Sequence, residues 1–289
     1  MCCIHFLLVT LRANPYSTPY VVWADKTGRL PEREDTEATR QGRDLEDYVA
    51  KRFTEQTGKA VRRKNKIIRN PKYPFAHANI DRAVVGESAG LECKTTGVLN
   101  LKRFKNGEYP EEYYCQCIHY MAVTGFEKWY LAVLVLSQGF TVYEIERDED
   151  EIKALMDAEK EFWDTYVLAD VPPPVDGMKA TTDAINKVFG ATHENEVDIS
   201  HLTNDIENLQ VLKSQIKTLD TQAEQIEQKI KVELGENTGG YSDKFKVTWL
   251  EQSRRTLDRK LITGAFPKID LSPYEKISRF RTLRIKEAN

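Results

Sequence analysis

The sequence predicts an α/β fold, in which a mixed β-sheet is flanked by helices and followed by a mainly helical C-terminal region with a long amphipathic helix. Three observations predict this fold. Hydrophobic spacing switches between helical and strand periods in the order α-β-β-β-α-β-β-α. A nearly continuous apolar run at residues 129–136 is typical of a buried strand. Three consecutive prolines at 172–174 then end the pattern, because proline continues neither a helix nor an inner strand.

The composition describes a globular protein rather than a membrane, disordered or disulfide-rich one. Hydrophobic residues make up 40% and charged residues 30% of the 289 positions, enough apolar material for a packed core. The longest apolar runs, at 6–9 and 131–136, are far shorter than the roughly 20 residues of a transmembrane helix, and no secretory signal is visible. Five cysteines, an odd number without metal-finger spacing, indicate neither a disulfide framework nor a zinc module. We therefore expect a reduced, cytoplasmic protein without a membrane partner.

The first elements are predicted from spacing and turn signals. Apolar residues recur every four positions within a helix at 37–57, and Gly58 is placed to end it. A strand rich in basic side chains follows at 59–69. After a turn with two prolines, short strands at 78–85 and 90–95 flank a turn-like Gly-Glu-Ser-Ala segment, as in a hairpin.

The next elements alternate in the same way. Pro110 opens a helix at 111–124, the buried strand at 129–136 follows, and residues 140–145 alternate as its partner strand. A further amphipathic helix spans 149–167. Helices that alternate with strands are expected to cover the faces of one sheet.

The prolines divide the chain into regions of different character. We predict a core domain at 1–169, a linker at 170–177 and a C-terminal region at 178–289 that serves assembly or contact with another molecule. A helix at 201–234 carries one narrow apolar stripe, which requires a partner helix either in the same domain or on another chain. Residues 241–289 form a basic tail with twelve bases against six acids.

The net charge of −3 hides a segregation of charges. Residues 51–72 hold nine basic side chains and one acidic one, whereas residues 144–164 hold ten acids and three bases. A basic stripe on an otherwise acidic protein fits contact with phosphates along one face. A solvated charged face is the alternative.

Acidic residues and a lysine gather on the two hairpin strands. Glu92 and Lys94 are two residues apart and share one face of the strand at 90–95, while Cys93 points away. In a hairpin, Asp81 can approach the same face. Two carboxylates and the Cys93 carbonyl form an all-oxygen site that suits Mg²⁺, and a neighbouring lysine can orient a water that attacks phosphorus. Alone, this spacing also fits charges on a solvent-facing edge strand.

Residues on the flanking helices favour the metal-site interpretation over solvent-facing charges. Glu46 lies on the helix before the basic strand, and Gln116 and Tyr120 are four residues apart on one face of a later helix. With these residues the chain resembles the lambda-exonuclease-like, YqaJ-type viral recombinase nucleases of the PD-(D/E)XK superfamily. The matching segments, within roughly residues 14–170, are NPYSTPYVVWADKTGRLPE (14–32), GRDLEDYVAKRF (42–53), VRRKNKIIRNPKYPFAHANIDRAVVGE (61–87), LECKTT (91–96) and YYCQCIHYMAVTG (113–125).

The resemblance implies a restriction-endonuclease-like fold and a Mg²⁺-dependent DNA exonuclease, with Mn²⁺ as a substitute, that digests linear duplex DNA in the 5′-to-3′ direction. Such an enzyme generates single strands for phage-type homologous recombination. The resemblance also implies double-stranded DNA ends as substrate, a single-strand annealing protein as partner and a homo-oligomeric ring such as a trimer. The implied location is the cytoplasm of a bacterial host, with a phage or prophage origin.

The resemblance further implies roles for individual residues around the metal. Asp81, Glu92 and the Cys93 backbone carbonyl would bind the metal directly, and Glu46 would hold it through a water. Lys94 would position the attacking water.

Two more catalytic positions and a set of DNA contacts complete the implied site. Gln116 matches a glutamine beside the site, and Tyr120 matches a tyrosine that either contacts the scissile strand or packs in the core. His119 is expected to be a structural histidine with its hydrogen bonds satisfied rather than a catalytic base. Phosphates would be gripped, without reading of bases, by Arg62, Arg63, Lys64, Lys66, Thr95 and Thr96.

The chain departs from the family pattern in three places. Ile80 precedes Asp81, where the superfamily has proline. His77 and Asn79 stand where some relatives place a further acid, so we expect a second metal to be held weakly or by the substrate. Residues 1–10 replace an Ile-Gly-Gly-Ser-Asp-like motif, which predicts either incomplete recognition of the DNA end or a shortened reading frame.

Two other functions compete with this one. A Cas4- or RecB-like nuclease shares the Gln-x-x-x-Tyr pair but commonly carries C-terminal cysteines for an iron–sulfur cluster, and no cysteine follows Cys117. The second competing function is that of a non-catalytic DNA-binding scaffold with a decayed nuclease core. The intact set of Glu46, Asp81, Glu92 and Lys94 argues against it.

Overall fold

The chain divides into two compact units, an N-terminal unit at 1–190 and a C-terminal unit at 191–289. The computed structural model describes residues 17–32, 35–104, 107–190, 195–266, 268–275 and 281–286. Residues 1–10, which depart from the family pattern, lie outside this described part. The boundary at 190 falls beyond the three prolines, so the N-terminal unit includes residues that the sequence analysis grouped with the C-terminal region.

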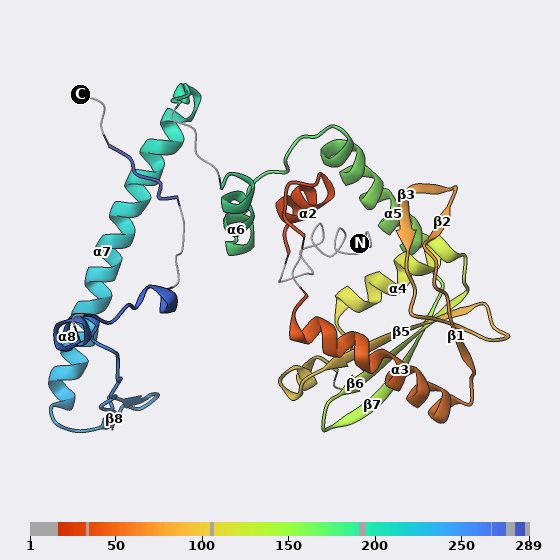
Figure 1. The fold of residues 1–289 in the computed structure, drawn as a ribbon, viewed down its shortest axis with the longest axis horizontal. Coiled ribbons are helices and arrows are strands. Elements are labelled where there is room, and N and C mark those ends of the chain that lie inside the picture. Colours follow the sequence, from red (N-terminus) through yellow and green to blue (C-terminus); the bar gives the residue numbers. More distant parts are fainter. Residues whose placement is uncertain are drawn as a thin grey trace. The chain divides into compact units, whose positions relative to one another are not determined.

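A five-stranded mixed sheet in the order β1-β4-β5-β6-β7 forms the centre of the N-terminal unit (Figure 1). Its strands are β1 (Val61–Arg63), β4 (Arg82–Val84), β5 (Ala89–Thr96), β6 (Lys128–Val135) and β7 (Gly139–Glu146). β5 and β6 run parallel, while the other neighbours are antiparallel. Most of β6 is buried, as its apolar run predicts. The predicted mixed sheet flanked by helices is confirmed.

Helices cover the two faces of this sheet because alternate residues of each strand point to opposite sides. The helix α3 (Glu37–Thr57) packs on the face that carries Leu91 and Tyr130. The helices α4 (Glu111–Thr124) and α5 (Glu149–Phe162) pack on the other face. α3 ends as predicted at Gly58, whose φ of +73° is a left-handed conformation that glycine adopts without strain. Glu92 and Lys94 belong to the α4 face.

The basic segment before the site forms two short strands rather than one, which corrects the prediction of a single strand at 59–69. After β1 the chain leaves the main sheet and forms a separate hairpin of β2 (Ile68–Asn70) and β3 (Tyr73–Ala78). The predicted strand at 78–85 is also broken, because the chain bends at 79–81 before β4 begins. The prolines around this turn cannot donate ladder hydrogen bonds, which confines the segment to an edge hairpin.

A small second core closes the N-terminal unit. The helices α2 (Pro19–Lys26) and α6 (Lys179–Val188) pack around Tyr20, Trp23 and Ala184. The Oγ1 atoms of Thr18 and Thr181 lie 2.7 Å apart across this contact. Two short helical segments complete the unit, the 3₁₀ helix η1 (Val98–Phe104) and the π-helical turn η2 (Trp163–Leu168).

The C-terminal unit consists of one long helix and short peripheral elements. The helix α7 (Thr203–Leu234) fits the predicted helix at 201–234. Among the described residues of this unit only Leu234 is buried, so the described elements of this unit leave the apolar stripe of α7 uncovered. No helix in the described residues has the length and hydropathy to span a membrane. The remaining elements are η3 (Ser200–Leu202), β8 (Gly239–Tyr241), β9 (Lys246–Thr248), α8 (Arg259–Ala265) and η4 (Ser272–Tyr274).

Candidate active site

The strand β5 presents Glu92 and Lys94 side by side toward α4. Glu92 is only 3% exposed, and the Lys94 Nζ lies 2.7 Å from its Oε1. Burial alone would lower the pKa of the Lys94 ammonium, but the Glu92 and Asp81 carboxylates outweigh burial and raise that pKa. Lys94 is therefore protonated at neutral pH and acts as a fixed positive charge.

The helix α4 contributes Gln116, which links the lysine and the glutamate. The Gln116 side-chain amide donates to Glu92 Oε1 at 2.7 Å and accepts from Lys94 Nζ at 2.9 Å. It also donates to the Tyr120 hydroxyl at 3.0 Å. The Gln116 amide and the Lys94 ammonium thus both contact the same oxygen of Glu92, Oε1. The other oxygen, Oε2, is buried and has no hydrogen-bond partner among the described residues.

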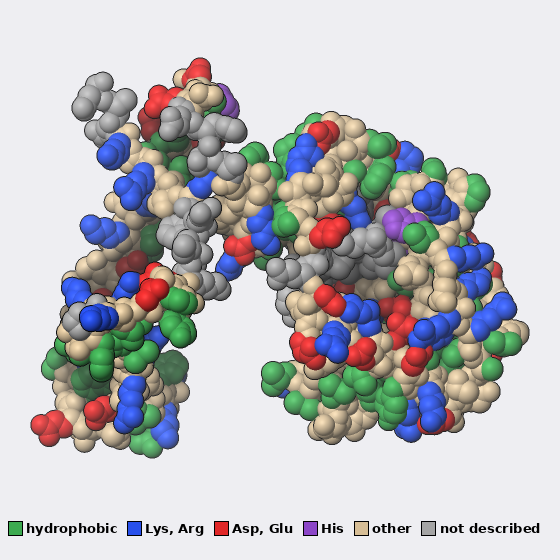
Figure 2. All heavy atoms as spheres, viewed as in Figure 1, with side chains coloured by type: hydrophobic (Ala, Val, Ile, Leu, Met, Phe, Trp, Pro, Cys, Tyr) green, Lys and Arg blue, Asp and Glu red, His purple; other side chains and the backbone are tan. Residues whose placement is uncertain are grey.

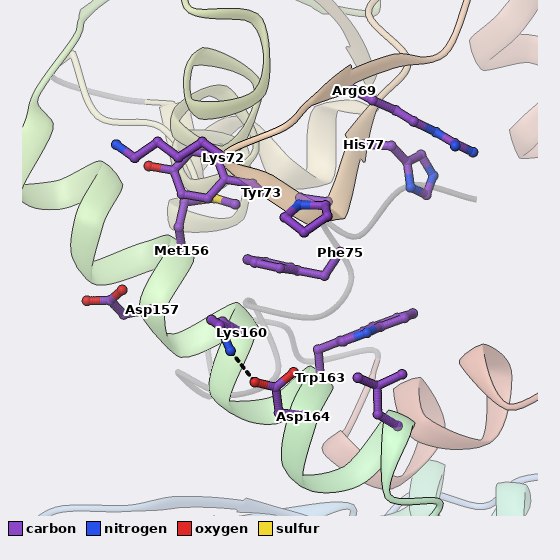
Figure 3. Close-up of a pocket in the computed structure, with 13 residues that line it drawn as sticks. Arg69, Lys72, Tyr73, Phe75, His77, Met156, Asp157, Lys160, Trp163 and Asp164 are labelled. Atoms are coloured by element: carbon purple, nitrogen blue, oxygen red, sulfur yellow. Dashed lines mark hydrogen bonds and ion pairs between the residues drawn. The ribbon is translucent and has the colours of Figure 1, made fainter.

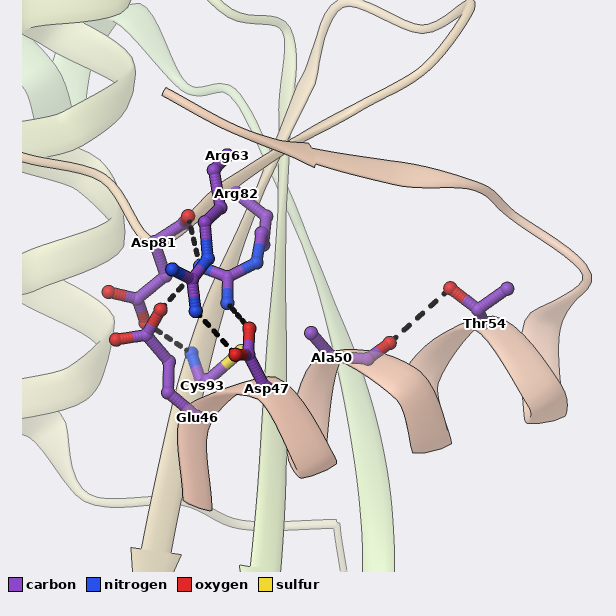
Figure 4. Close-up of polar contacts among 8 residues, drawn as sticks. All are labelled: Glu46, Asp47, Ala50, Thr54, Arg63, Asp81, Arg82 and Cys93. Carbon is purple, nitrogen blue, oxygen red and sulfur yellow. Dashed lines mark hydrogen bonds and ion pairs between the residues drawn. The ribbon is translucent and has the colours of Figure 1, made fainter. Parts of the chain in front are cut away.

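Asp81 lies at the bend before β4, next to the same strand. The backbone N–H of Cys93 donates to Asp81 Oδ2 at 2.8 Å (Figure 4). Burial raises the pKa of the Asp81 carboxyl, and the nearby Glu92 and Glu46 carboxylates raise it further. The charges of the other two acids predicted from the sequence therefore act on the Asp81 carboxyl.

Glu46, on α3, is held by an arginine that the sequence analysis did not single out. Arg82 is 4% exposed and forms an ion pair with Glu46. It also donates to Asp47 Oδ1 at 2.5 Å and to the Asp81 backbone carbonyl at 2.6 Å (Figure 4). Arg63 reaches the same Asp47 at 2.5 Å. The strand period was the signal that could have pointed to Arg82. Because successive residues of a strand point to opposite sides, the residue directly after Asp81 points toward α3.

The donor groups fit a hard divalent cation, although the described residues include no group of three or more His, Cys, Asp or Glu already arranged to hold a metal. The free oxygen of Glu92 is one donor without a partner. Asp81 is a second carboxylate, and its crowded charge is one that a cation would relieve. The Cys93 thiol does not suit this role, because burial raises its pKa and keeps it protonated. The Cys93 backbone carbonyl and a water-bridged Glu46 stay predicted ligands.

The predicted DNA-contacting residues lie on β1, in the loop after β1 and at the end of β5, and their side chains differ in how strongly other residues hold them. Arg62 and Lys66 are exposed and have no ion-pair partner within the described part of the chain. Arg63 is engaged by Asp47, and the Lys64 ammonium lies 5.4 Å from the centre of the Phe126 ring. The half-buried Thr95 and Thr96 end β5. Figure 2 shows Lys and Arg side chains gathered on the side of the N-terminal unit where β1 and β2 lie.

Comparisons with known proteins add a sequence relationship to this geometry. A family model described as a YqaJ-like viral recombinase domain matches residues 8–127. The uncharacterized protein YqaJ of Bacillus subtilis (strain 168) is 38% identical over 289 residues, which cover 97% of this chain and 89% of that protein.

Two solved structures are more distantly similar. An alkaline exonuclease from Laribacter hongkongensis is 19% identical with a TM-score of 0.48, over 58% of this chain and 87% of that one. A phage related exonuclease from Haemophilus somnus 129PT is 16% identical with a TM-score of 0.40, over 52% of this chain and 81% of that one. The sequence relationship is much the stronger of the two kinds of similarity.

Proposed function

Because the chain belongs to the YqaJ-like viral recombinase family, we propose that it is a Mg²⁺-dependent exonuclease that digests one strand of linear duplex DNA from the 5′ end. The observation that carries the proposal is the cluster around Glu92. Lys94 and Gln116 bind one oxygen of this carboxylate and leave the other buried without a partner. A buried polar atom without a partner is costly, and a ligand that binds there would remove the cost.

In this proposal Asp81, Glu92 and the Cys93 carbonyl hold Mg²⁺, for which Mn²⁺ can substitute, and Glu46 holds it through a water. The bound cation would neutralise charge that develops on the phosphate during hydrolysis. The ion pair between Glu46 and Arg82 keeps this carboxylate at the edge of the site.

The side chains around the metal ligands have separate tasks. Lys94, with its raised pKa, keeps its proton and orients the attacking water or a phosphate oxygen rather than removing a proton itself. Gln116 fixes the positions of Lys94 and Glu92 together. Tyr120 is 3% exposed and bonds Gln116, which suits support of the glutamine better than contact with the scissile strand.

DNA would be gripped through its phosphates along the basic side of the N-terminal unit. Arg62 and Lys66, exposed and unpaired among the described residues, are the strongest candidates. Binding by phosphate contact alone falls steeply with salt. A single-strand annealing protein or further copies in a ring would bind the exposed stripe of α7. The products would be single strands for homologous recombination.

A digestion assay tests the proposal. Linear duplex DNA with labelled 5′ or 3′ ends is incubated with the full chain in Mg²⁺, Mn²⁺ or EDTA. We expect metal-dependent release of nucleotides from the 5′ end. Lys94→Ala should lower the rate by about 10²- to 10⁴-fold, the usual effect of removing a positioned catalytic group. Glu92→Gln, which keeps the side-chain shape, should abolish metal-dependent activity.

The matched control is Lys128→Ala, which removes a lysine that pairs with Glu144 and Glu146 on β7 and should leave digestion unchanged. Duplex binding by the wild type without any digestion would contradict the proposal and favour a DNA-binding scaffold. Digestion that persists in EDTA would contradict the metal dependence.

A further inference from the structure

A groove of about 630 Å³ lies between the hairpin strand β3 and the end of α5 with η2. Three aromatic side chains line it, Tyr73 and Phe75 from β3 and Trp163 from η2. Phe75 and Trp163 face each other from the two walls, while Arg69, Lys72 and Tyr73 lie along the hairpin side (Figure 3). Its volume is in the range of ligand-binding pockets.

The charges around the groove favour an anion. The two acids that line it are already neutralised within α5 and η2, since Asp157 is 2.6 Å from Lys153 and Asp164 pairs with Lys160. Arg69 and Lys72 are exposed, and neither forms an ion pair with a described residue. The excess charge along the hairpin wall is therefore positive.

A buried histidine connects this groove to the candidate active site. His119 Nδ1 lies 2.7 Å from Glu159 Oε1 on α5, and its Nε2 lies 3.1 Å from the His77 carbonyl on β3. It thus ties together the two walls of the groove. On α4, His119 is adjacent to Tyr120, which bonds Gln116. The strand β3 itself leads, within three residues of its end, to Asp81. The groove and the Glu92 cluster consequently share one rigid support.

We propose that this groove binds single-stranded DNA next to the cleavage site, with bases stacked on Phe75 and Trp163 and phosphates bound by Arg69 and Lys72. The inference rests on the proposed nuclease function and adds a second substrate contact to it. Aromatic rings beside a basic stripe bind single strands of any sequence, because every base has a π-face that stacks. A duplex buries its bases and cannot use the rings in this way. A peptide without acidic side chains would contact the rings but would leave the positive wall without a counter-charge.

The test uses the full chain with Lys94→Ala, so that the probe is not digested. Binding of a fluorescently labelled oligothymidine is measured by anisotropy. Adding Trp163→Leu or Phe75→Leu keeps apolar volume but removes the stacking surface, and each should weaken binding about tenfold. Trp163→Phe should restore most of the affinity. Arg69→Gln and Lys72→Gln should each reduce the slope of log affinity against log salt by about 1.

The matched control is Phe140→Leu, which removes a half-buried aromatic ring of β7 on the face of the sheet that α3 covers and should not change the affinity. Thermal unfolding checks that the leucine variants remain folded. Affinity for oligothymidine that is the same in the parent and in both leucine variants would overturn the proposal. Failure of the nuclease proposal has a different signature, since the chain with Lys94 intact would then digest no duplex while oligothymidine binding still depended on Trp163.

Discussion

The two units of the chain differ in how they obtain their stability. The N-terminal unit buries residues from every layer around its mixed sheet, including the charged Arg82 and Glu92. The C-terminal unit has one buried residue, Leu234, among those that the structure describes. A rigid scaffold can hold catalytic groups in place, whereas a long helix without a core cannot. We therefore propose that the first unit carries the chemistry and that the second binds other molecules.

The helix α7 shows what the second unit lacks. Leu212, Leu219 and Ile226 are 54%, 61% and 59% exposed although they are spaced as in a coiled-coil seam. Local ion pairs, such as Lys231 with Glu227 at 3.1 Å, stabilise the helix only slightly. Single helices in water are marginal even at favourable length. Such a stripe is typical of a surface that gains its stability on assembly.

The largest expected effect is a difference in backbone hydrogen exchange between the units. Amides of β6 should exchange through global opening, and those of α7 through local fraying, so protection should differ by about 10³-fold or more. Exchange measured by mass spectrometry on the free protein checks this. Equal protection in β6 and α7 would mean that α7 is packed in the free chain, and the comparison would fail.

The next largest difference between the units is expected in the free energy of unfolding that is lost when a leucine is shortened to alanine. Leu131→Ala removes a fully buried side chain of β6 and should cost about 2 to 5 kcal/mol in the free energy of unfolding. Leu219→Ala, the same substitution in the stripe of α7, should change it by less than about 0.5 kcal/mol. Denaturant titration of each variant gives both values. A large loss for Leu219→Ala would show that the stripe already has a partner.

Within the N-terminal unit, a buried and an exposed arginine should also differ in how much they contribute to the melting temperature. Arg82→Met leaves Glu46 and Asp47 without their buried partner and should lower the melting temperature by about 6 °C or more. Arg63 binds the same Asp47 from an exposed position, so Arg63→Met should lower it by less than about 2 °C. Melting followed by circular dichroism measures both. Similar shifts for the two variants would remove the special role of Arg82.

The smallest expected effect is a stabilisation rather than a loss of stability. The raised pKa of Asp81 means that its carboxylate destabilises the metal-free fold above that pKa and that the penalty disappears as pH falls through it. Asp81→Asn should thus raise the melting temperature at neutral pH by about 2 to 4 °C while abolishing digestion. In EDTA, the gain over the wild type should shrink toward zero at acidic pH. A gain that is independent of pH would exclude the Asp81 charge as its cause.

Periodicity predicted the regular elements of the fold well, because their burial follows from spacing alone. The helix α4 begins and ends at the predicted residues, and β5 and β6 match within one residue. The segment between α3 and β4 was not predictable in this way. Its basic residues satisfy a strand pattern, but the prolines and the bend before Asp81 redirect the chain into an edge hairpin.

The candidate site was predictable in its residue types but not in its connections. The spacing of Glu92 and Lys94 places them together, and the helical spacing of Gln116 and Tyr120 does the same. The strand period points Arg82 away from the side of Asp81, but its ion pair with Glu46 depends on α3 packing across the sheet, a tertiary contact that no local pattern encodes. The metal, the direction of digestion and the partner stay predictions for the assays above.

The contact between α2 and α6 has a practical consequence for anyone who shortens this protein. The row of prolines invites a cut near residue 172, but that cut would discard Thr181 and Ala184 and expose the faces of Tyr20 and Trp23 to water. A fragment that ends at residue 190 keeps the packing contact between α2 and α6, which lie toward its two ends. Fusion partners and affinity tags at the far end belong after that position.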